Sequence, residues 1–259
     1  MITGREDLLN IALEAAKKAA SFISAESHKV RQVDFKGKTN LVTQADRGSE
    51  EIILAIIRSN YPDHNIITEE SAGQTTDSPF TWIVDPLDGT TNFVHSYPFY
   101  AVSIAVHKDG VPQAGVIVDV YHRHTYTATV RGGARRNGEP IHVTDKRKLH
   151  DSLLATGFQY KHDDVWERNF DYYKTFTDIT QGVRRAGAAA LDLVHVACGW
   201  LDGFWEFGLN SWDAAAGVLI VEEAGGKVSK TDGSQFSIHT PDILATNGKI
   251  HGEMLTIFE

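Results

Sequence analysis

Apolar and polar residues recur with two different periods along the chain, and each period predicts one type of element. Residues 6–26 carry apolar side chains three and four positions apart, the spacing of an amphipathic helix. A second helix is predicted between Thr43 and Tyr61-Pro62, because Thr43 and Asp46 have the spacing of a capping box. Alternating, β-branched stretches predict strands in the first half at residues 64–69, 80–85, 100–108, 113–120 and 124–130.

The second half of the chain alternates strand and helix patterns more regularly. Strands are predicted at residues 153–156, 182–185, 203–207 and 242–246, and helices at 164–178, 187–200, 212–224 and the C-terminal end. An antiparallel first half and an α/β second half predict an α+β protein with layers of helices and sheets. The polar residues 145–151 suggest a boundary between an N-terminal lobe, residues 1–148, and a C-terminal lobe, residues 149–259.

Composition and charge narrow the class of protein. Of the 259 residues 42% are apolar, enough to fill a core, and the formal net charge of −9 argues against a nucleic-acid binder. No apolar run approaches the ~20 residues that cross a bilayer, and the first residues lack the apolar segment of a secretory signal. Cys198 is the only cysteine, so no internal disulfide can form. We therefore expect a cytoplasmic protein with no membrane partner.

The acidic residues around a single turn give the most informative chemical signal. An apolar strand runs into Asp85, Pro86 is expected to end its ladder, and Asp88 follows three positions after Asp85. Gly89 lets a ligand approach the backbone, and a short helix that begins at Thr90 would direct amides at an anion. Two converging acids beside an anion-binding turn make sense when a cation lies between them.

Other acidic residues also lie at the ends of predicted elements, and they are Asp46, Glu69, Glu206 and Asp213. Each alone has a structural interpretation, as a capping residue, a surface charge, a solvated strand end or a partner of a helix dipole. The set contains no histidine or cysteine, so it favours a hard, oxygen-preferring ion such as Mg²⁺ or Mn²⁺ over structural zinc.

Two stretches resemble the signatures of the inositol monophosphatase family, within the lithium-sensitive, fructose-bisphosphatase-like superfamily. They are WIVDPLDGTTNF at residues 82–93 and WDAAAG at residues 212–217. The resemblance covers essentially the whole chain. It implies a layered α/β/α/β/α sandwich that is assembled as a homodimer.

The resemblance also implies roles for individual residues. Two to three Mg²⁺ ions, or Mn²⁺ as a substitute, would be bound by Glu69, Asp85, the carbonyl of Leu87, Asp88 and Asp213. The catalytic residues that act on the attacking water would be Asp46, Glu69 and Thr90. Substrate would be contacted by Gly89, Thr90, Gly187, Ala188, Glu206 and Asp213. Lys36 would be a lysine on a loop near the metals.

The implied reaction is the Mg²⁺-dependent hydrolysis of a small phosphorylated polyol or sugar, with inositol 1-phosphate as the first candidate. Histidinol phosphate and fructose 1,6-bisphosphate stay open as substrates. A haloacid-dehalogenase-type phosphatase is disfavoured, because its two acids are two positions apart whereas Asp85 and Asp88 are three apart. A regulatory scaffold that binds RNA or protein is another alternative, and it would use the basic residues between positions 131 and 148.

Two further groups of reactive residues have weaker signals. His195 and Cys198 lie one helical turn apart, as a thiol–imidazole pair would, but their apolar neighbours favour a core position. His122 and His124 are expected on one face of a strand, where an exposed or hydrogen-bonded pair is favoured over a metal site.

Overall fold

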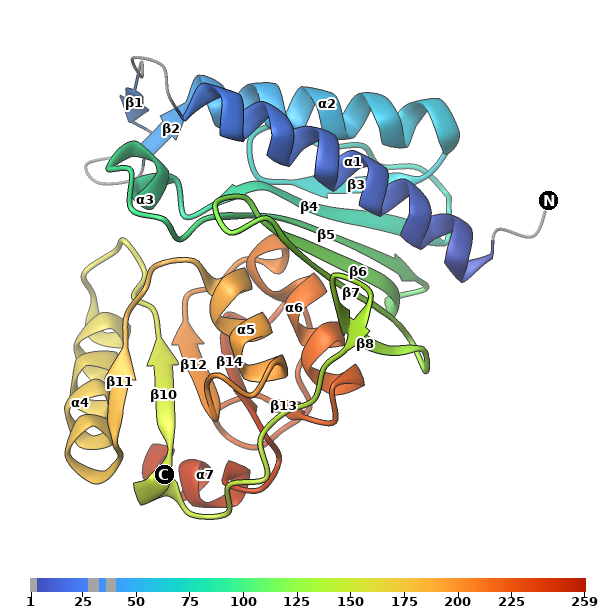
Figure 1. Ribbon diagram of the computed structural model, residues 1–259. Coiled ribbons are helices and arrows are strands. Elements are labelled where there is room, and N and C mark those ends of the chain that lie inside the picture. The colour runs from blue at the N-terminus through green and yellow to red at the C-terminus, as the bar shows by residue number, and fades with distance from the viewer. Residues whose placement is uncertain (1–3, 28–32, 36–40) are drawn as a thin grey trace.

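The computed structural model describes residues 4–27, 33–35 and 41–259, and it stacks helices and sheets in five layers (Figure 1). Helices α1 (Arg5–Glu26) and α2 (Gln44–Asn60) cover one face of the first sheet. Helices α5 (Ala189–Ala197) and α6 (Ser211–Glu223) lie between this sheet and the second one. The far face of the second sheet is covered by α4 (Asp164–Ile179) and α7 (His251–Phe258). This order confirms the expected layered α/β/α/β/α fold.

The first sheet has seven strands in the described part of the chain. In spatial order they are β3 (Asn65–Thr68), β4 (Phe80–Asp88), β5 (Ala101–Lys108), β6 (Val111–Asp119), β7 (His124–Thr129), β8 (Gly133–Arg136) and β9 (Glu139–Pro140). Strands β3 and β4 are parallel, and every later neighbour is antiparallel. The short strands β1 (Val33–Phe35) and β2 (Leu41–Thr43) form a separate antiparallel pair before α2.

Strand β4 passes through Pro86, so the prediction that the ladder ends there is wrong. Asp85 pairs with Ser103 and Asp88 with Ala101, and the register shifts between these two pairs. Three positions on β4 therefore match two on β5, which is a β-bulge with one extra residue. Proline is tolerated at a bulge because no ladder hydrogen bond is required of it there. The bulge lies between the two acids that the sequence singled out.

The second sheet has five strands in the order β11-β10-β12-β14-β13 among the described residues. Their bounds are β10 (Leu153–Thr156), β11 (Gly182–Arg184), β12 (Gly203–Phe207), β13 (Lys227–Ser229) and β14 (Asp242–Thr246). Strand β10 runs parallel to β11 and β12, whereas β14 is antiparallel to β12 and β13. Helix α5 is shorter than the predicted 187–200, because Gly187 and Gly199 have left-handed φ values of 89° and 69° on either side of it.

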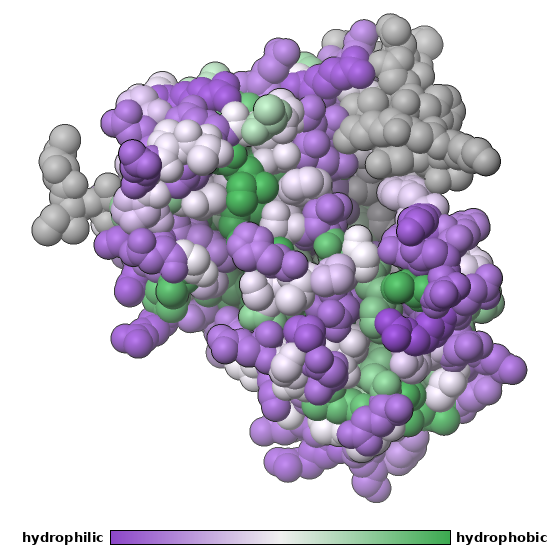
Figure 2. All heavy atoms as spheres, turned by 180° about the vertical axis from the view of Figure 1, so that it is seen from behind, coloured by the Kyte–Doolittle hydropathy of each residue, from purple (hydrophilic) through white to green (hydrophobic). Residues whose placement is uncertain are grey.

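Three apolar cores fill the spaces between the layers. One lies between α1, α2 and the first sheet, a second between the two sheets, and a third beneath α4 and α7. Figure 2 shows a back face on which hydrophilic side chains predominate and hydrophobic ones form separate small patches. None of the helices that the structure describes combines the length and apolarity needed to cross a membrane.

Candidate active site

A cavity of about 370 Å³ collects the acidic residues that the sequence singled out, except Asp46. Its walls come from β4, β12, the short helix α3 (Thr90–Val94), the first turns of α5 and α6, and residues 157–160. Among the described residues that line it, one is basic, Arg185. The acidic ones are Glu69, Asp85, Asp88, Asp192, Glu206 and Asp213. Segments far apart in the sequence therefore meet in one strongly acidic cavity.

Backbone amides hold three of these carboxylates. Asp85 Oδ1 accepts a hydrogen bond from the amide of Leu87, 3.0 Å away, across the β-bulge. Asp88 Oδ2 accepts from the amide of Ala190 in the first turn of α5, at 2.7 Å. Asp213 occupies the third position of α6, and its Oδ2 accepts from the amide of Asn210 at 2.7 Å, completing a capping box. These bonds orient the carboxylates without neutralising their charge.

Burial and mutual repulsion disfavour the charged form of these acids. Burial raises the pKa of Asp85 well above its usual range, and the charges of Glu69, Asp88 and Asp213 raise it further. Burial, followed by the charge of Asp213, raises the pKa of Asp88 in the same way. Burial also raises the pKa of Asp213 to about 6. A cation within the cavity would relieve this repulsion.

The donor set fits a hard divalent cation. All the cavity acids offer carboxylate oxygens, the ligands that Mg²⁺ and Mn²⁺ prefer, and Leu87 adds a backbone carbonyl on the bulge. Thr90 Oγ1 lies 3.1 Å from that carbonyl oxygen. As the described side chains are placed, no three acidic, histidine or cysteine groups form a ready-made cluster. Ion binding would therefore draw the carboxylates closer together.

A hydrogen bond joins Asp46 to Thr90 beside these carboxylates. Thr90 Oγ1 donates to Asp46 Oδ1 at 2.7 Å, and Asp46 Oδ2 accepts from the amide of Thr43 at 2.7 Å. Burial raises the pKa of Asp46, although the hydrogen bonds from Thr43 and Thr90 oppose that shift. The capping box predicted for α2 is therefore present, and the same carboxylate reaches the candidate site.

The turn at Gly89 requires glycine for two reasons. Its φ of 87° lies in the left-handed region, and a Cβ there would be 2.9 Å from the carbonyl oxygen of Phe99. This tight turn starts α3, so that Thr90 follows directly on the bulge that carries Asp88.

The predicted substrate-facing residues line the same cavity. Glu206, on β12, lies against Gly157, where any Cβ would collide with its carboxylate. Burial raises the pKa of Glu206 well above its usual range, with additional effects from Asp213 and Asp192. Gly187 and Ala188 line the cavity just before α5. Lys36, the predicted loop lysine, lies outside the described residues.

The sequence interpretation missed Arg185, Asp192 and Tyr160, which all line the cavity. Asp192 is 2% exposed and is an isolated acid in the otherwise apolar segment from Ala189 to Val194. An acid at a buried helix position is unusual unless it has a partner or a ligand, and this was the signal that could have found it.

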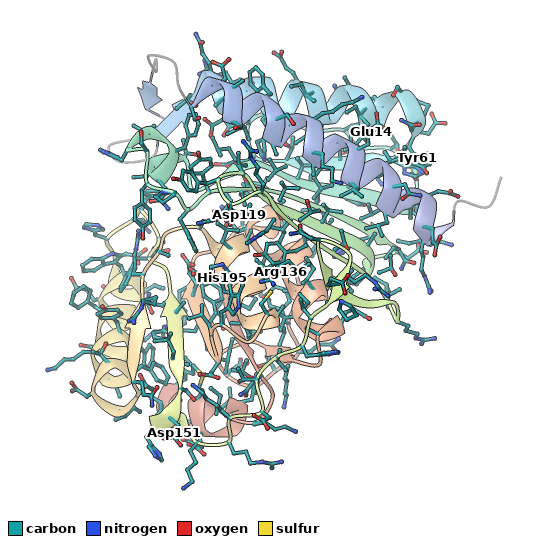
Figure 3. The ribbon with its side chains drawn as sticks, in the orientation of Figure 1. Glu14, Tyr61, Asp119, Arg136, Asp151 and His195 are labelled. Carbon is teal, nitrogen blue, oxygen red and sulfur yellow. The ribbon has the colours of Figure 1, made fainter. Side chains whose placement is uncertain are left out.

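His195 and Cys198 lie outside the cavity lining, and the ring of His195 packs against two aromatic rings. Figure 3 shows His195 on α5 in the middle of the molecule. Its ring packs edge to face against Phe99 and Trp200, at centroid distances of 5.4 and 4.8 Å. Burial lowers the pKa of His195 to about 4 and raises that of Cys198 to about 11. Both side chains are half-buried, and Cys198 packs against the core between the two sheets, so the pair lies at the edge of the core and not fully inside it.

His122 and His124 do not share a strand face as expected, because His122 lies in the turn before β7. Arg123 between them has a left-handed φ of 58°. His122 Nδ1 lies 2.8 Å from the buried Asp119 Oδ2, and the rings of His122 and His124 stack 6.1 Å apart. The contact between His122 and Asp119 therefore favours a hydrogen-bonded histidine over a metal site.

Taken together, the layered fold and a cavity in which carboxylates surround a glycine turn at the start of a short helix indicate a hydrolase of phosphoric monoesters. Comparison with known proteins gives the same class. The model of the inositol monophosphatase family matches residues 5–259. The inositol-1-monophosphatase of Synechocystis sp. is 49% identical over 249 residues, covering 95% of this chain and 86% of that protein.

Two further relatives are similar over nearly their whole length. The Nus factor SuhB of Pseudomonas aeruginosa is 40% identical over 261 residues, covering 98% of this chain and 96% of that protein. The solved structure of the inositol monophosphatase from Anabaena (Nostoc) sp. superposes with a TM-score of 0.89 at 44% identity, covering 97% of this chain and 94% of that one. The chain belongs to the inositol monophosphatase family.

Proposed function

We propose that the protein hydrolyses a small phosphorylated polyol with the help of magnesium, and that inositol 1-phosphate is its preferred substrate. One observation carries the proposal: Glu69, Asp85, Asp88 and Asp213, from three separate segments, line one cavity beside the Asp46–Thr90 hydrogen bond. The names of the relatives from Synechocystis and Anabaena support the choice of substrate. Histidinol phosphate and fructose 1,6-bisphosphate are the competing substrates.

The cavity acids would hold the metal. Glu69, Asp85, Asp88, Asp213 and the carbonyl of Leu87 are the proposed ligands of two to three Mg²⁺ ions, with Mn²⁺ as a substitute. When bound, such ions lower the pKa of a water molecule and offset negative charge on the phosphate ester.

The turn at Gly89 would hold the phosphate. Backbone amides at the start of a helix bind anions well, and the amides of Gly89 and Thr90 are those nearest to the bulge. Because Gly89 has no side chain, the phosphate can approach this backbone closely.

Thr90 and Asp46 would orient the attacking water and take its proton. Thr90 Oγ1 already donates its proton to Asp46 Oδ1, so its lone pairs can accept a hydrogen bond from a water molecule. As the water attacks phosphorus, its proton can pass to Thr90 Oγ1 while the hydroxyl proton of Thr90 moves to Asp46 Oδ1. The raised pKa of Asp46 favours this transfer. Glu69 would assist from the metal side, and no phosphorylated enzyme is required.

A panel of phosphomonoesters tests the proposal. Phosphate release would be measured from inositol 1-phosphate, histidinol phosphate, fructose 1,6-bisphosphate and glycerol 1-phosphate, each with Mg²⁺ and with a chelator. We expect inositol 1-phosphate to have the highest kcat/KM, and we expect the chelator to abolish activity on every substrate. Mg²⁺ should also raise the thermal unfolding midpoint, because it binds the folded state. Hydrolysis that persists in the chelator would contradict the proposal.

Three further properties are proposed from family membership. The protein would be a homodimer, would be inhibited by lithium and would act in the cytoplasm. Sedimentation velocity and a lithium titration of phosphate release test the first two directly.

A regulatory scaffold is the second candidate function. It is supported by the relatives that are named Nus factor SuhB and by exposed basic residues, which include Arg131, Arg135, Arg147 and Lys148. Lys146 and Arg136 are less available, since Lys146 pairs with Asp202 at 3.3 Å and Arg136 lies over the ring of Trp200. Retention on RNA that falls with salt, and is lost when the four exposed residues are neutralised, would support this role.

A further inference from the structure

Three charged side chains line the cavity but are not among the proposed metal ligands or the proposed phosphate-binding groups. They are Arg185, which precedes α5, Asp192 on α5, and Glu206 on β12. The positive charge of Arg185 lowers the pKa of both acids, against the larger effect of their burial. The guanidinium also lies close to Gly187, where a Cβ would be 3.1 Å from Arg185 Nη1. The three groups therefore form one polar wall of the cavity.

Within the described residues these groups lack direct partners. No hydrogen bond or ion pair reaches the carboxylate of Asp192 or that of Glu206 from the rest of the described chain, and no direct ion pair joins either acid to Arg185. Asp192 is nevertheless only 2% exposed. A buried carboxylate without a partner reduces stability, so its place in an apolar helix is explained best by a ligand.

The chemistry of the wall selects among possible leaving groups. A guanidinium only donates hydrogen bonds and a carboxylate only accepts them, whereas a hydroxyl does both. Neighbouring hydroxyls of a polyol can therefore satisfy Arg185 and Asp192 together. A second phosphate would meet the negative charges of Asp192 and Glu206, which outnumber the single positive charge of Arg185.

We propose that Asp192, with Arg185 beside it, determines specificity by binding hydroxyls of the leaving group, so that the enzyme selects monophosphates of polyols. The inference rests on the proposed function and deepens it. It separates inositol 1-phosphate from fructose 1,6-bisphosphate, which carries a second phosphate.

The variant Asp192→Asn tests the proposal against two substrates. Inositol 1-phosphate offers hydroxyls to the wall, and phenyl phosphate offers none. We expect kcat/KM for inositol 1-phosphate to fall about 10- to 100-fold, mostly through KM, because a hydrogen bond to a charged group is lost. The loss for phenyl phosphate should be much smaller, so that the ratio of the two kcat/KM values falls about tenfold. Asp171→Asn, on the exposed face of α4, is the matched control and should leave both values unchanged.

Thermal unfolding gives a second readout that a purely structural role would move in the opposite direction. If the role of Asp192 is to bind substrate and not to stabilise the fold, the neutral side chain of Asp192→Asn should raise the unfolding midpoint of the substrate-free protein by roughly 2–4 °C. A lower midpoint together with an unchanged substrate ratio would show that Asp192 only supports the fold, and an equal loss for both substrates would place it on the phosphate side. Either result overturns the proposal.

A second variant covers the case in which Asp192→Asn does not fold. Arg185 is exposed, so Arg185→Gln should fold, and it should lower the same ratio through KM. An unchanged ratio in that variant overturns the proposal. If the unaltered protein hydrolyses neither substrate, the proposed function itself is wrong and the inference fails with it. Hydrolysis of both substrates with no difference between the variants leaves the function standing and refutes the specificity wall alone.

Discussion

Helix α5 contributes to two groups of titratable side chains with opposite surroundings. Toward the cavity, Asp192 joins Asp85, Asp88 and Asp213, whose carboxylates accept hydrogen bonds from backbone amides. In the second group, which we call the histidine cluster (Asp119, His122, His124, His195 and Cys198), His195 is packed by aromatic rings and Asp119 bonds to His122. Both groups contain residue types that catalyse reactions. Within the described part of the chain, Asp192 and Glu206 in the cavity have carboxylate oxygens with no hydrogen-bond partner, so this group can still bind a ligand.

The difference explains why residue types alone are a poor guide to function. Burial shifts the pKa of groups in both places, upward for Asp213 and downward for His195, so a shifted pKa does not separate them. The two groups differ in whether their side chains face an open cavity or are packed against other side chains. The four predictions below test that distinction, beginning with the largest expected effect.

Asp88→Asn should remove most of the activity while changing the shape of the cavity little. The amide keeps the size of the side chain but removes a metal-binding charge, so we expect kcat/KM for inositol 1-phosphate to fall at least about 100- to 1000-fold. The unfolding midpoint without metal should not fall, because the repulsion between Asp88 and Asp213 is reduced. Asp171→Asn again serves as the control, and a fully active Asp88→Asn enzyme would show that the metal assignment is wrong.

Thr90→Ala should reduce kcat by about 100-fold with a smaller effect on KM. The substitution removes the hydroxyl between the attacking water and Asp46 Oδ1, and loss of a positioned proton acceptor typically costs at least that much. Thr90→Ser keeps the hydroxyl and is the matched control, so it should stay within about tenfold of the unaltered enzyme. Equal losses in the two variants would mean that the methyl group matters and that the hydroxyl does not relay a proton.

The fold could be predicted from the sequence where local signals and tertiary structure agree. Helix α2 is one example, because Thr43 and Asp46 determine its start through their own side chains. The passage of β4 through Pro86 could not be predicted, since it depends on the register with β5, a partner whose alignment is set by the sheet. Strand β13, with three residues, was missed, although β11, which is equally short, was predicted.

The site was predictable to the extent that its residues end an element. Asp88 ends β4 and Asp213 lies in the first turn of α6, and the ends of elements are the places where chains expose functional groups. Asp85 was found with them because it precedes the same turn by three positions, although β4 continues past it. Asp192 lies inside an apolar helix, and Arg185 lies in a short connection. Which way these two face depends on how α5 packs between two sheets, and a single sequence does not contain that information.

His195→Leu should remove part of the pH dependence of folding. The pKa of His195 is about 4 in the folded protein against 6.5 in the unfolded chain, so the contribution of the neutral ring is complete above pH 6.5. It is lost as the pH falls from 6.5 toward 4, by about 1–3 kcal/mol in the free energy of unfolding.

Urea unfolding at several pH values measures this effect. The stability difference between the unaltered protein and His195→Leu should shift in favour of the variant as the pH falls. The exposed His142, changed to leucine, should give a difference that varies less with pH. If the stability difference depended on pH equally in the two variants, the ring of His195 would be exposed to water. The contrast between the histidine cluster and the cavity would then be weaker.

Cys198→Ala should have the smallest effect. The substitution tests the thiol–imidazole pair, the part of the histidine cluster that most resembles an active site. Burial raises the pKa of the thiol to about 11, so roughly one thiol in 10,000 is ionised at pH 7, and Cys198 is absent from the cavity lining. We expect kcat/KM for inositol 1-phosphate to stay within about twofold. The unaltered protein should also keep its activity after treatment with iodoacetamide under native conditions. A tenfold loss in either experiment would mean that a thiol–imidazole pair takes part in the reaction, and that packing among aromatic rings does not mark a group as structural.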